Sequence, residues 1–137
     1  MNQFPSKNFF TLPNEIFSLG LSVGEIAVYA YLRCLENPST YQCWPSYATI
    51  GKAIGRTKNT VMQYVDALSE KGLISTEPTS VLTKSRIKKN GNLRYTIKPI
   101  HEAVEIFHAR QLSAVERAAE RQRVQRKLSA MDMPPGA

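Results

Sequence analysis

Two short helical segments separated by three residues limit the possible fold more than any other feature of this chain. Ser46 is a typical N-cap residue in front of the segment 47–54, and Gly55 is a typical residue to end it. Thr57 is placed to cap a second segment, 58–71, after a turn of only three residues. This spacing predicts a helix-turn-helix, in which a glycine adopts the unusual backbone angles of the turn.

Two helices are expected before this motif. A short one follows Pro13, because a proline at a helix start sacrifices no hydrogen bond, and it should end near Gly20. A longer one begins at Ser22, which forms a capping box with Glu25, and continues to about Glu36. Its apolar surface comprises Ile26, Tyr29, Ala30, Leu32 and Cys34, which predicts packing in the core. The following residues up to Pro45 are rich in turn-forming types and are expected to form a loop.

The segment after the second helix of the motif favours strands. Leu73 and Ile74 should begin one strand, Pro78 interrupts it, and the alternating residues 93–97 form another. Between them, Asn90-Gly91 is a strong signal for a two-residue hairpin turn, because both residue types tolerate positive φ. We therefore expect a two-stranded wing.

The last third of the chain favours one long helix, from His101 to about Ala130. Several apolar residues fall within about a third of its helical wheel: Ile100, Ala103, Val104, Phe107, Ala114, Val115 and Ala118. The predicted fold is mainly α with a small β-hairpin. It divides into a winged helix-turn-helix domain (1–100), an amphipathic helix for packing or dimerisation (101–130) and a flexible tail (131–137).

The positive charge of the chain is confined to one segment. Residues 46–100 carry ten basic and three acidic side chains, whereas residues 1–45 carry two and three, and residues 101–137 carry six and five. The middle segment alone therefore has a net charge of +7, which equals the formal net charge of the whole chain. Such a localised excess is typical of a protein that binds a polyanion, and double-stranded DNA is the expected partner.

The segment 58–71 separates an apolar arc, made by Val61, Val65 and Leu68, from a polar face. Amide side chains can form paired hydrogen bonds with adenine, and a lysine can address guanine or a phosphate. The alternative is a polar face that is simply solvated. The candidate base contacts are Lys58, Asn59, Thr60 and Gln63.

A second group of residues is suited to phosphate contacts. The unpaired N–H groups at a helix start favour anions, and basic side chains crowded on a ribbon repel one another unless an anion compensates them. The alternatives are capping alone for the hydroxyls and protection of a sheet edge for the lysines. The candidates are Ser46, Lys52, Arg56, Thr57, Lys84, Arg86, Lys88, Lys89 and Arg94.

Other classes of protein find little support. No apolar run approaches the roughly 18 residues that a membrane span needs, so we expect a cytoplasmic protein without a membrane partner. Cys34 and Cys43 are interpreted as small core residues, and Trp44 also as core. The two histidines, His101 and His108, have no neighbours in sequence that would complete a metal or nucleophile set. We expect no enzyme activity, no metal and no cofactor.

Three stretches of the chain resemble the winged-helix helix-turn-helix family that is common in bacterial regulators and in replication proteins of plasmids, phages and conjugative elements. They are WPSYATIG (44–51), GRTKNTV (55–61) and LSEKGLI (68–74). The resemblance covers roughly residues 9–100. It implies that segment 46–54 supports the recognition helix, that segment 58–72 reads the major groove, and that a hairpin flanks it.

Three functions remain open at this point. The first is a transcriptional regulator, expected to be a homodimer that reads a two-fold site. The second is a replication or partition factor of a mobile element, which would recruit a protein partner through residues 101–130. The third is a protein-interaction module on a winged-helix scaffold, against which the basic wing argues.

Overall fold

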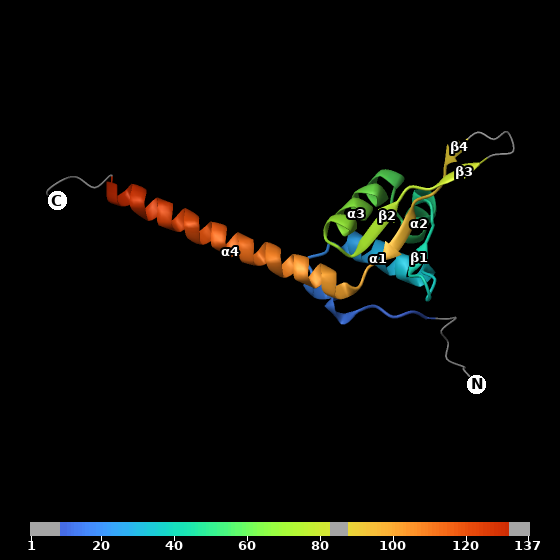
Figure 1. Ribbon diagram of the computed structural model, residues 1–137, viewed down its shortest axis with the longest axis horizontal. Helices are drawn as coiled ribbons and strands as arrows, with labels where there is room; N and C mark the ends of the chain where they lie inside the picture. The colour runs from blue at the N-terminus through green and yellow to red at the C-terminus, as the bar shows by residue number, and fades with distance from the viewer. Residues whose placement is uncertain (1–8, 83–87, 132–137) are drawn as a thin grey trace.

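The computed structural model describes residues 9–82 and 88–131 (Figure 1). Three helices and a small sheet form a body. A long helix projects from one side of it, and a two-stranded ribbon projects from the other. The elements are η1 (Asn14–Ser18, a 3₁₀ helix), α1 (Val23–Leu35), β1 (Gln42–Cys43), α2 (Tyr47–Ile54), α3 (Lys58–Glu70), β2 (Ile74–Glu77), β3 (Ser80–Leu82), β4 (Lys88–Asn90), β5 (Arg94–Ile97) and α4 (Ile100–Met131).

The helix starts and ends follow the capping residues. Ser22 and Glu25 form the expected capping box at α1, with both hydrogen bonds 3.2 Å long. The hydroxyl of Ser46 accepts a hydrogen bond from the Thr49 N–H at the start of α2 (3.0 Å), and Gly55 ends this helix with φ at +74°. The predicted bounds of the two motif helices are confirmed to within one residue.

The core of the body lies where α1, α3 and the sheet meet. Val61, Val65 and Leu68 of α3 are buried, which confirms the predicted apolar arc. They pack with side chains from α1 and from the strands: Val28, Tyr29, Leu32, Leu73, Ile74, Tyr95 and Ile97. Helix α3 is therefore fixed to α1 and to the sheet through one apolar cluster.

The predicted loop before Pro45 contains a strand that the sequence did not indicate. Gln42 and Cys43 form β1, which pairs with β5 opposite Thr96 and Tyr95. The resulting antiparallel sheet has the order β1-β5-β2. A strand of two residues leaves no alternating pattern to read, so only its pairing with a distant segment reveals it.

The predicted hairpin turn at Asn90-Gly91 is wrong. Asn90 belongs to β4 and pairs with Ser80, and the Gly91 N–H donates to the Thr79 carbonyl (2.8 Å). The dipeptide therefore lies at the base of the ribbon, where β4 leads into β5. The connection between β3 and β4 falls in residues 83–87, outside the described part of the chain.

Two predicted core residues are exposed. Cys34 faces solvent, whereas Cys43 is buried as expected, and burial raises the pKa of its thiol to about 11. Trp44 is 49% exposed. Cys34 is the penultimate residue of α1, where Leu35 is also exposed, and helical periodicity alone does not reveal this.

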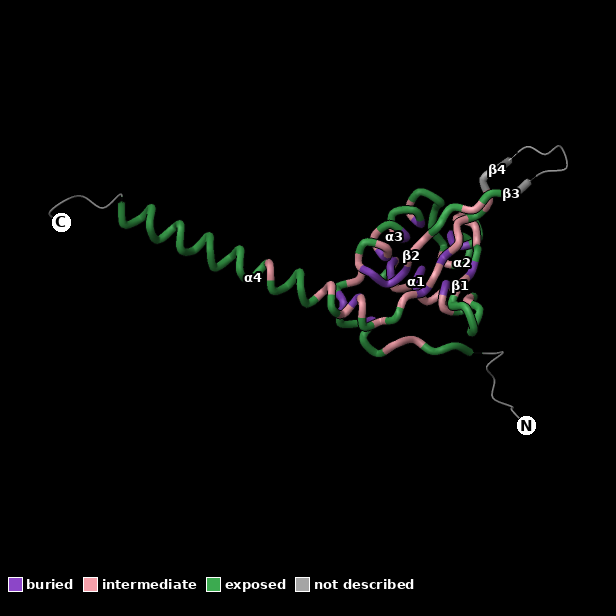
Figure 2. Tube along the Cα trace, in the orientation of Figure 1, coloured by how far each residue is buried: buried purple, intermediate pink, exposed green. Residues whose placement is uncertain are grey.

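The long helix α4 packs on the body only through its first turns (Figure 2). Ala103 is buried, and Ile100, Val104 and Phe107 pack partly against the core. The rest of the predicted apolar stripe, Ala114, Val115 and Ala118, is exposed. Within the described ranges, no helix combines the length and the apolar character needed to cross a bilayer.

An ion pair ties the end of α3 to the start of α1. Lys71 Nζ lies 2.6 Å from Glu25 Oε1 and 3.3 Å from the Gly20 carbonyl oxygen. Burial opposes ionisation of Glu25, but the hydrogen bonds from Lys71 and from the Ser22 N–H outweigh it and lower the pKa of this carboxyl. The pair is largely shielded from water, with the Glu25 side chain 12% exposed.

Lys71→Met should lower the free energy of unfolding by about 1 to 2 kcal/mol at pH 7, because Glu25 loses its counter-charge while its burial persists. Since the folded-state pKa of Glu25 is lowered, its contribution is present above the ordinary glutamate pKa and disappears as the pH falls through the folded-state value. Urea unfolding at pH 7 and pH 3 measures both effects. The double variant Glu25→Gln, Lys71→Met is the control and should recover stability. A deficit for Lys71→Met that is as large at pH 3 as at pH 7 would contradict this interpretation.

Candidate nucleic-acid interface

The start of α3 presents polar side chains to solvent. Lys58, Asn59 and Gln63 are exposed; Asn59 and Gln63 lie on the side of the helix opposite its buried arc, and Lys58 is its first residue. Thr60 is half-buried, and its hydroxyl accepts a hydrogen bond from the Thr57 hydroxyl (3.0 Å) within the N-cap. Three of the four predicted base-contact residues are thus free to meet a ligand, whereas Thr60 also serves the cap.

The turn between α2 and α3 is held by a close backbone approach. The N–H groups of Gly55 and Arg56 both donate to the Gly51 carbonyl, at 2.8 and 2.9 Å. Gly51 is buried, and a Cβ atom on it would lie 2.4 Å from the Arg56 carbonyl oxygen. The absence of a side chain at Gly51 therefore lets the turn sit directly on α2 and sets the angle at which α3 leaves.

Of the predicted phosphate ligands of the motif, Ser46 and Thr57 lie at the starts of α2 and α3, Arg56 lies in the turn between them, and Lys52 lies in the last turn of α2. Lys52, Arg56 and Thr57 are exposed, and Ser46 is half-buried. Ser46 and Thr57 both act as caps, each accepting a hydrogen bond from the N–H three residues later. Neither α2 nor α3 has an acidic residue in its first turn, so the positive ends of both helix dipoles remain uncompensated.

A groove of about 330 Å³ separates the start of α2 from the base of the wing ribbon. Ser46 and Tyr47 line one side of it, and Thr79 and Asn92 line the other. The ribbon itself, β3 with β4, extends beyond the body on this side (Figure 1). The start of α2 and the wing are therefore neighbours in space.

The predicted basic residues of the wing do not share one environment. Lys88 and Lys89 belong to β4, opposite Leu82 and Val81, while Lys84 and Arg86 lie outside the described residues. Arg94 is half-buried and forms an ion pair with Glu77, its partner in the β2–β5 register. Arg94 is thus already bound to a carboxylate, and a phosphate would have to compete with Glu77 for it.

Trp44 lies beside the wing base, although the sequence predicted it in the core. The Asn92 amide donates to the Trp44 carbonyl (3.1 Å), and the Thr79 hydroxyl donates to the Asn92 carbonyl. Trp44 therefore lies at the junction of β1, α2 and the wing base, with its side chain partly exposed. The sequence signal for its place beside α2 is that Trp44 directly precedes Pro45 and the N-cap residue of α2. In the part of the chain that the structure describes, no group of His, Cys, Asp and Glu side chains could hold a metal ion.

Comparison with known proteins agrees with this geometry. Residues 19–74, which include α1, α2, the turn and α3, match the family model described as a helix-turn-helix domain. These residues form a helix-turn-helix domain. A comparison with curated proteins gives no match.

Several solved structures are similar to the chain that carries this helix-turn-helix domain. A "possible transcriptional regulator" from Methanosarcina mazei is 15% identical, with 78% of this chain and 81% of that chain covered and a TM-score of 0.52. A MarR-family transcriptional regulator from Silicibacter pomeroyi is 19% identical (85% and 74% covered, TM-score 0.40). The MepR–DNA complex of Staphylococcus aureus is 14% identical (85% and 82% covered, TM-score 0.43).

At these identities the likeness concerns the fold alone, and only the first of these three TM-scores exceeds 0.5. The helix-turn-helix domain is followed by the β2–β5 wing and by α4. The predicted fold class, a winged helix-turn-helix with a long C-terminal helix, is confirmed.

Proposed function

We propose that this chain binds double-stranded DNA in a sequence-specific manner and acts as a transcriptional regulator. The observation that carries the proposal is the exposed polar face of α3, which projects from a body that buries its opposite face. A helix held in this way fits the width of the major groove. The excess of positive charge in residues 46–100 supplies the attraction to the phosphates.

Each side chain of this face has a chemical role in the proposal. Asn59 and Gln63 donate to and accept from adenine through their amides, and Lys58 addresses guanine or a phosphate. The uncompensated starts of α2 and α3 receive phosphates, and Arg56 in the turn and Lys52 in the last turn of α2 add positive charge. The wing follows the backbone next to the groove, as its lysines and its position beside α2 favour.

The double variant Asn59→Ala, Gln63→Ala should lose sequence preference, at about 1 to 3 kcal/mol for each good base contact. The helix start keeps its cap, so binding to arbitrary duplex should change little. Selection of bound sequences from a random duplex pool gives the site. Titration of the selected and of a scrambled duplex then measures the preference at a fixed salt concentration.

Gln122→Ala is the matched control, because it removes an exposed amide from distal α4 rather than from α3. Equal preference for the selected duplex in the wild type and in the double variant would refute the base-contact assignment. A wild-type protein that binds no duplex at low salt would refute the function itself. That second result would favour a protein-interaction module.

A replication or partition role would use the same DNA contacts and would need a protein partner on residues 101–130.

A further inference from the structure

Asp66 is an acidic residue on the exposed face of α3. Its side chain is exposed, and it follows Gln63 by three residues and Asn59 by seven. At about 100° per residue, the three side chains fall within about 60° of one another, on the side of the helix away from the buried arc. A carboxylate therefore shares the surface that carries the two amides of the proposed base contacts.

Asp66 differs from the other two acidic residues of segment 46–100. Glu77 forms an ion pair with Arg94, and Arg110 Nη2 lies 3.7 Å from Glu70 Oε1. Asp66 forms no ion pair with any side chain that the structure describes. Its neighbours one helical turn away carry no positive charge either. They are Met62, Gln63, Ser69 and Glu70.

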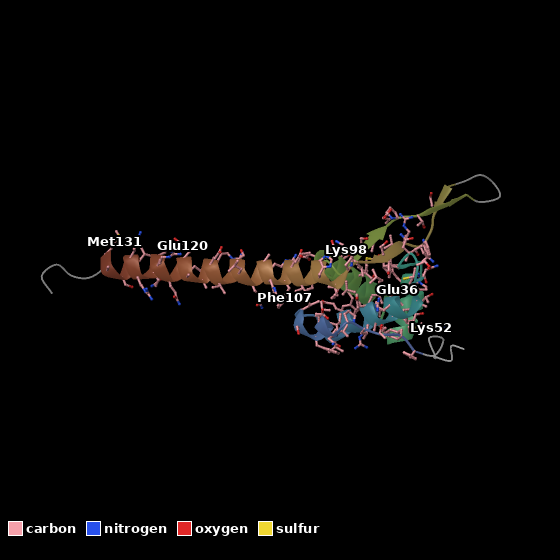
Figure 3. The ribbon with its side chains drawn as sticks, turned by 60° about the horizontal axis from the view of Figure 1, so that its bottom comes forward. Glu36, Lys52, Lys98, Phe107, Glu120 and Met131 are labelled. Atoms are coloured by element: carbon pink, nitrogen blue, oxygen red, sulfur yellow. The ribbon has the colours of Figure 1, made fainter. Side chains whose placement is uncertain are left out.

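The Asp66 carboxylate lies near the start of α2. Burial, and after it the negative charge of Asp66, raises the pKa of Tyr47, the first residue of α2. Tyr47 also lines the groove between α2 and the wing base. The basic side chains of distal α4 are remote from this place, since Figure 3 shows Glu120 and Met131 on the part of α4 that extends away from the body. Asp66 thus belongs to the surface of the proposed interface, without a counter-charge from distal α4.

A carboxylate on this surface opposes DNA binding in general, because it repels the phosphates that the rest of the segment attracts. Its interaction with the base edges of the major groove depends on the base. Guanine and thymine present acceptors to a carboxylate, which repel it, whereas cytosine N4 and adenine N6 are amino donors. Adenine also presents the N7 acceptor beside its amino group. Cytosine is therefore the base that matches a carboxylate best.

We propose that Asp66 accepts a hydrogen bond from the N4 amino group of a cytosine and thereby selects one base of the DNA site. This assignment rests on the proposed function and adds a specificity-determining residue to it. Asp66 lies about 10 Å beyond Asn59 along the helix, at 1.5 Å per residue. With bases about 3.4 Å apart, the cytosine is expected roughly two to three base pairs from the base that Asn59 contacts. Asp66 contributes discrimination, because it weakens binding to every other base at this position.

Selection of bound sequences from a random duplex pool, with the full-length wild type, Asp66→Ala and Asp66→Asn, tests the assignment. The wild-type site should contain a cytosine whose preference is lost in Asp66→Ala, while the other positions keep theirs. Asp66→Ala should also bind a scrambled duplex at least about twofold more tightly, since a repelling charge is gone. Asp66→Asn should select adenine at the same position, because an amide matches adenine N6 and N7. The same selected sequence for the wild type and Asp66→Ala would overturn the assignment.

Removal of one amino group from the DNA tests the contact itself. A duplex in which the selected cytosine is replaced by its analogue without the 4-amino group should bind the wild type at least about fivefold more weakly. Asp66→Ala should bind the two duplexes with dissociation constants within about twofold of each other. Any effect of the analogue on the duplex is common to both proteins and cancels in this comparison. Equal losses for the two proteins would contradict the hydrogen bond.

Glu70→Ala is the matched control. It removes an exposed carboxylate from the same helix and changes the net charge by the same amount, but Glu70 is paired with Arg110. Its base preference should equal that of the wild type at every position, and loss of the cytosine preference in this variant too would refute a specific role of Asp66. A wild type that binds no duplex would refute the proposed function as well. A wild type whose sequence preference survives in Asp66→Ala would refute the role of Asp66 alone.

Discussion

Gly51→Ala is expected to lower the free energy of unfolding by about 2 to 3 kcal/mol. Alanine favours a helix over glycine by about 1 kcal/mol, so a gain would be expected if the position were open. It is closed, because the new Cβ would lie 2.4 Å from the Arg56 carbonyl oxygen. Backbone atoms cannot rotate away as a flexible side chain can. The turn between α2 and α3 must therefore move.

Urea unfolding followed by circular dichroism measures the effect of Gly51→Ala, and Gly55→Ala four residues later is the matched control. A Cβ at Gly55 would meet nothing within 4 Å, but the residue holds φ at +74°. The expected cost there is only the left-handed strain, about 1 to 2 kcal/mol. Gly55→Asn should cost less, since asparagine tolerates this region. Stability of Gly51→Ala equal to or above the wild type would show that the turn is not held by this contact.

Tyr95→Ala should be the most destabilising single truncation in the sheet, at about 3 to 5 kcal/mol. Tyr95 is 1% exposed and lies in β5, the central strand, between Cys43 of β1 and Thr76 of β2. Its removal leaves a cavity under the strand that continues into the wing. Because β5 carries the ribbon, the variant should also bind DNA more weakly in the proposed function.

Tyr95→Phe is the control that separates the ring from its hydroxyl. Burial raises the pKa of Tyr95, so the group is neutral at pH 7 and the phenylalanine ring replaces it without loss of a charge. The expected cost is below about 1.5 kcal/mol by urea unfolding. If Tyr95→Phe costs as much as Tyr95→Ala, the hydroxyl rather than the packing of the ring is responsible.

The helix-turn-helix could be predicted from sequence because its signals are local. Ser46, Gly55 and Thr57 act on hydrogen bonds within a few residues of themselves, and this is why α2 and α3 begin where the caps indicate. The buried arc of α3 follows from the same local geometry. Val61, Val65 and Leu68 face inward because they share one side of a 3.6-residue repeat.

The errors concern features that depend on distant segments. Strand β1 exists because Gln42 and Cys43 meet β5 more than 50 residues later, and the turn chemistry of Asn90-Gly91 is used at the ribbon base because of its register with Thr79. The pairing of Arg94 with Glu77 likewise follows from register. The basic residues of this segment suit phosphate contacts, but their composition does not show that the Glu77 carboxylate lies beside Arg94.

The length of α4 that packs on the body could not be predicted from the sequence either. Periodicity shows that Ala114 and Ala118 share a helical side with Phe107, but it does not show where the body stops. The exposed Trp44 is a similar case, since aromatic character is the same in a core and at an interface. Burial is a property of the neighbours, and the neighbours come from the fold.

The projecting helix α4 also acts as a lever. Its 32 residues measure about 48 Å at 1.5 Å per residue, and only the first few turns are fixed to the body. A tilt of about 10° at the Lys98-Pro99 junction would displace Met131 by roughly 8 Å. Small changes in how Ile100 and Phe107 seat on the core are thus amplified along the helix. Whatever binds its far end will sense the orientation of the body that holds α3.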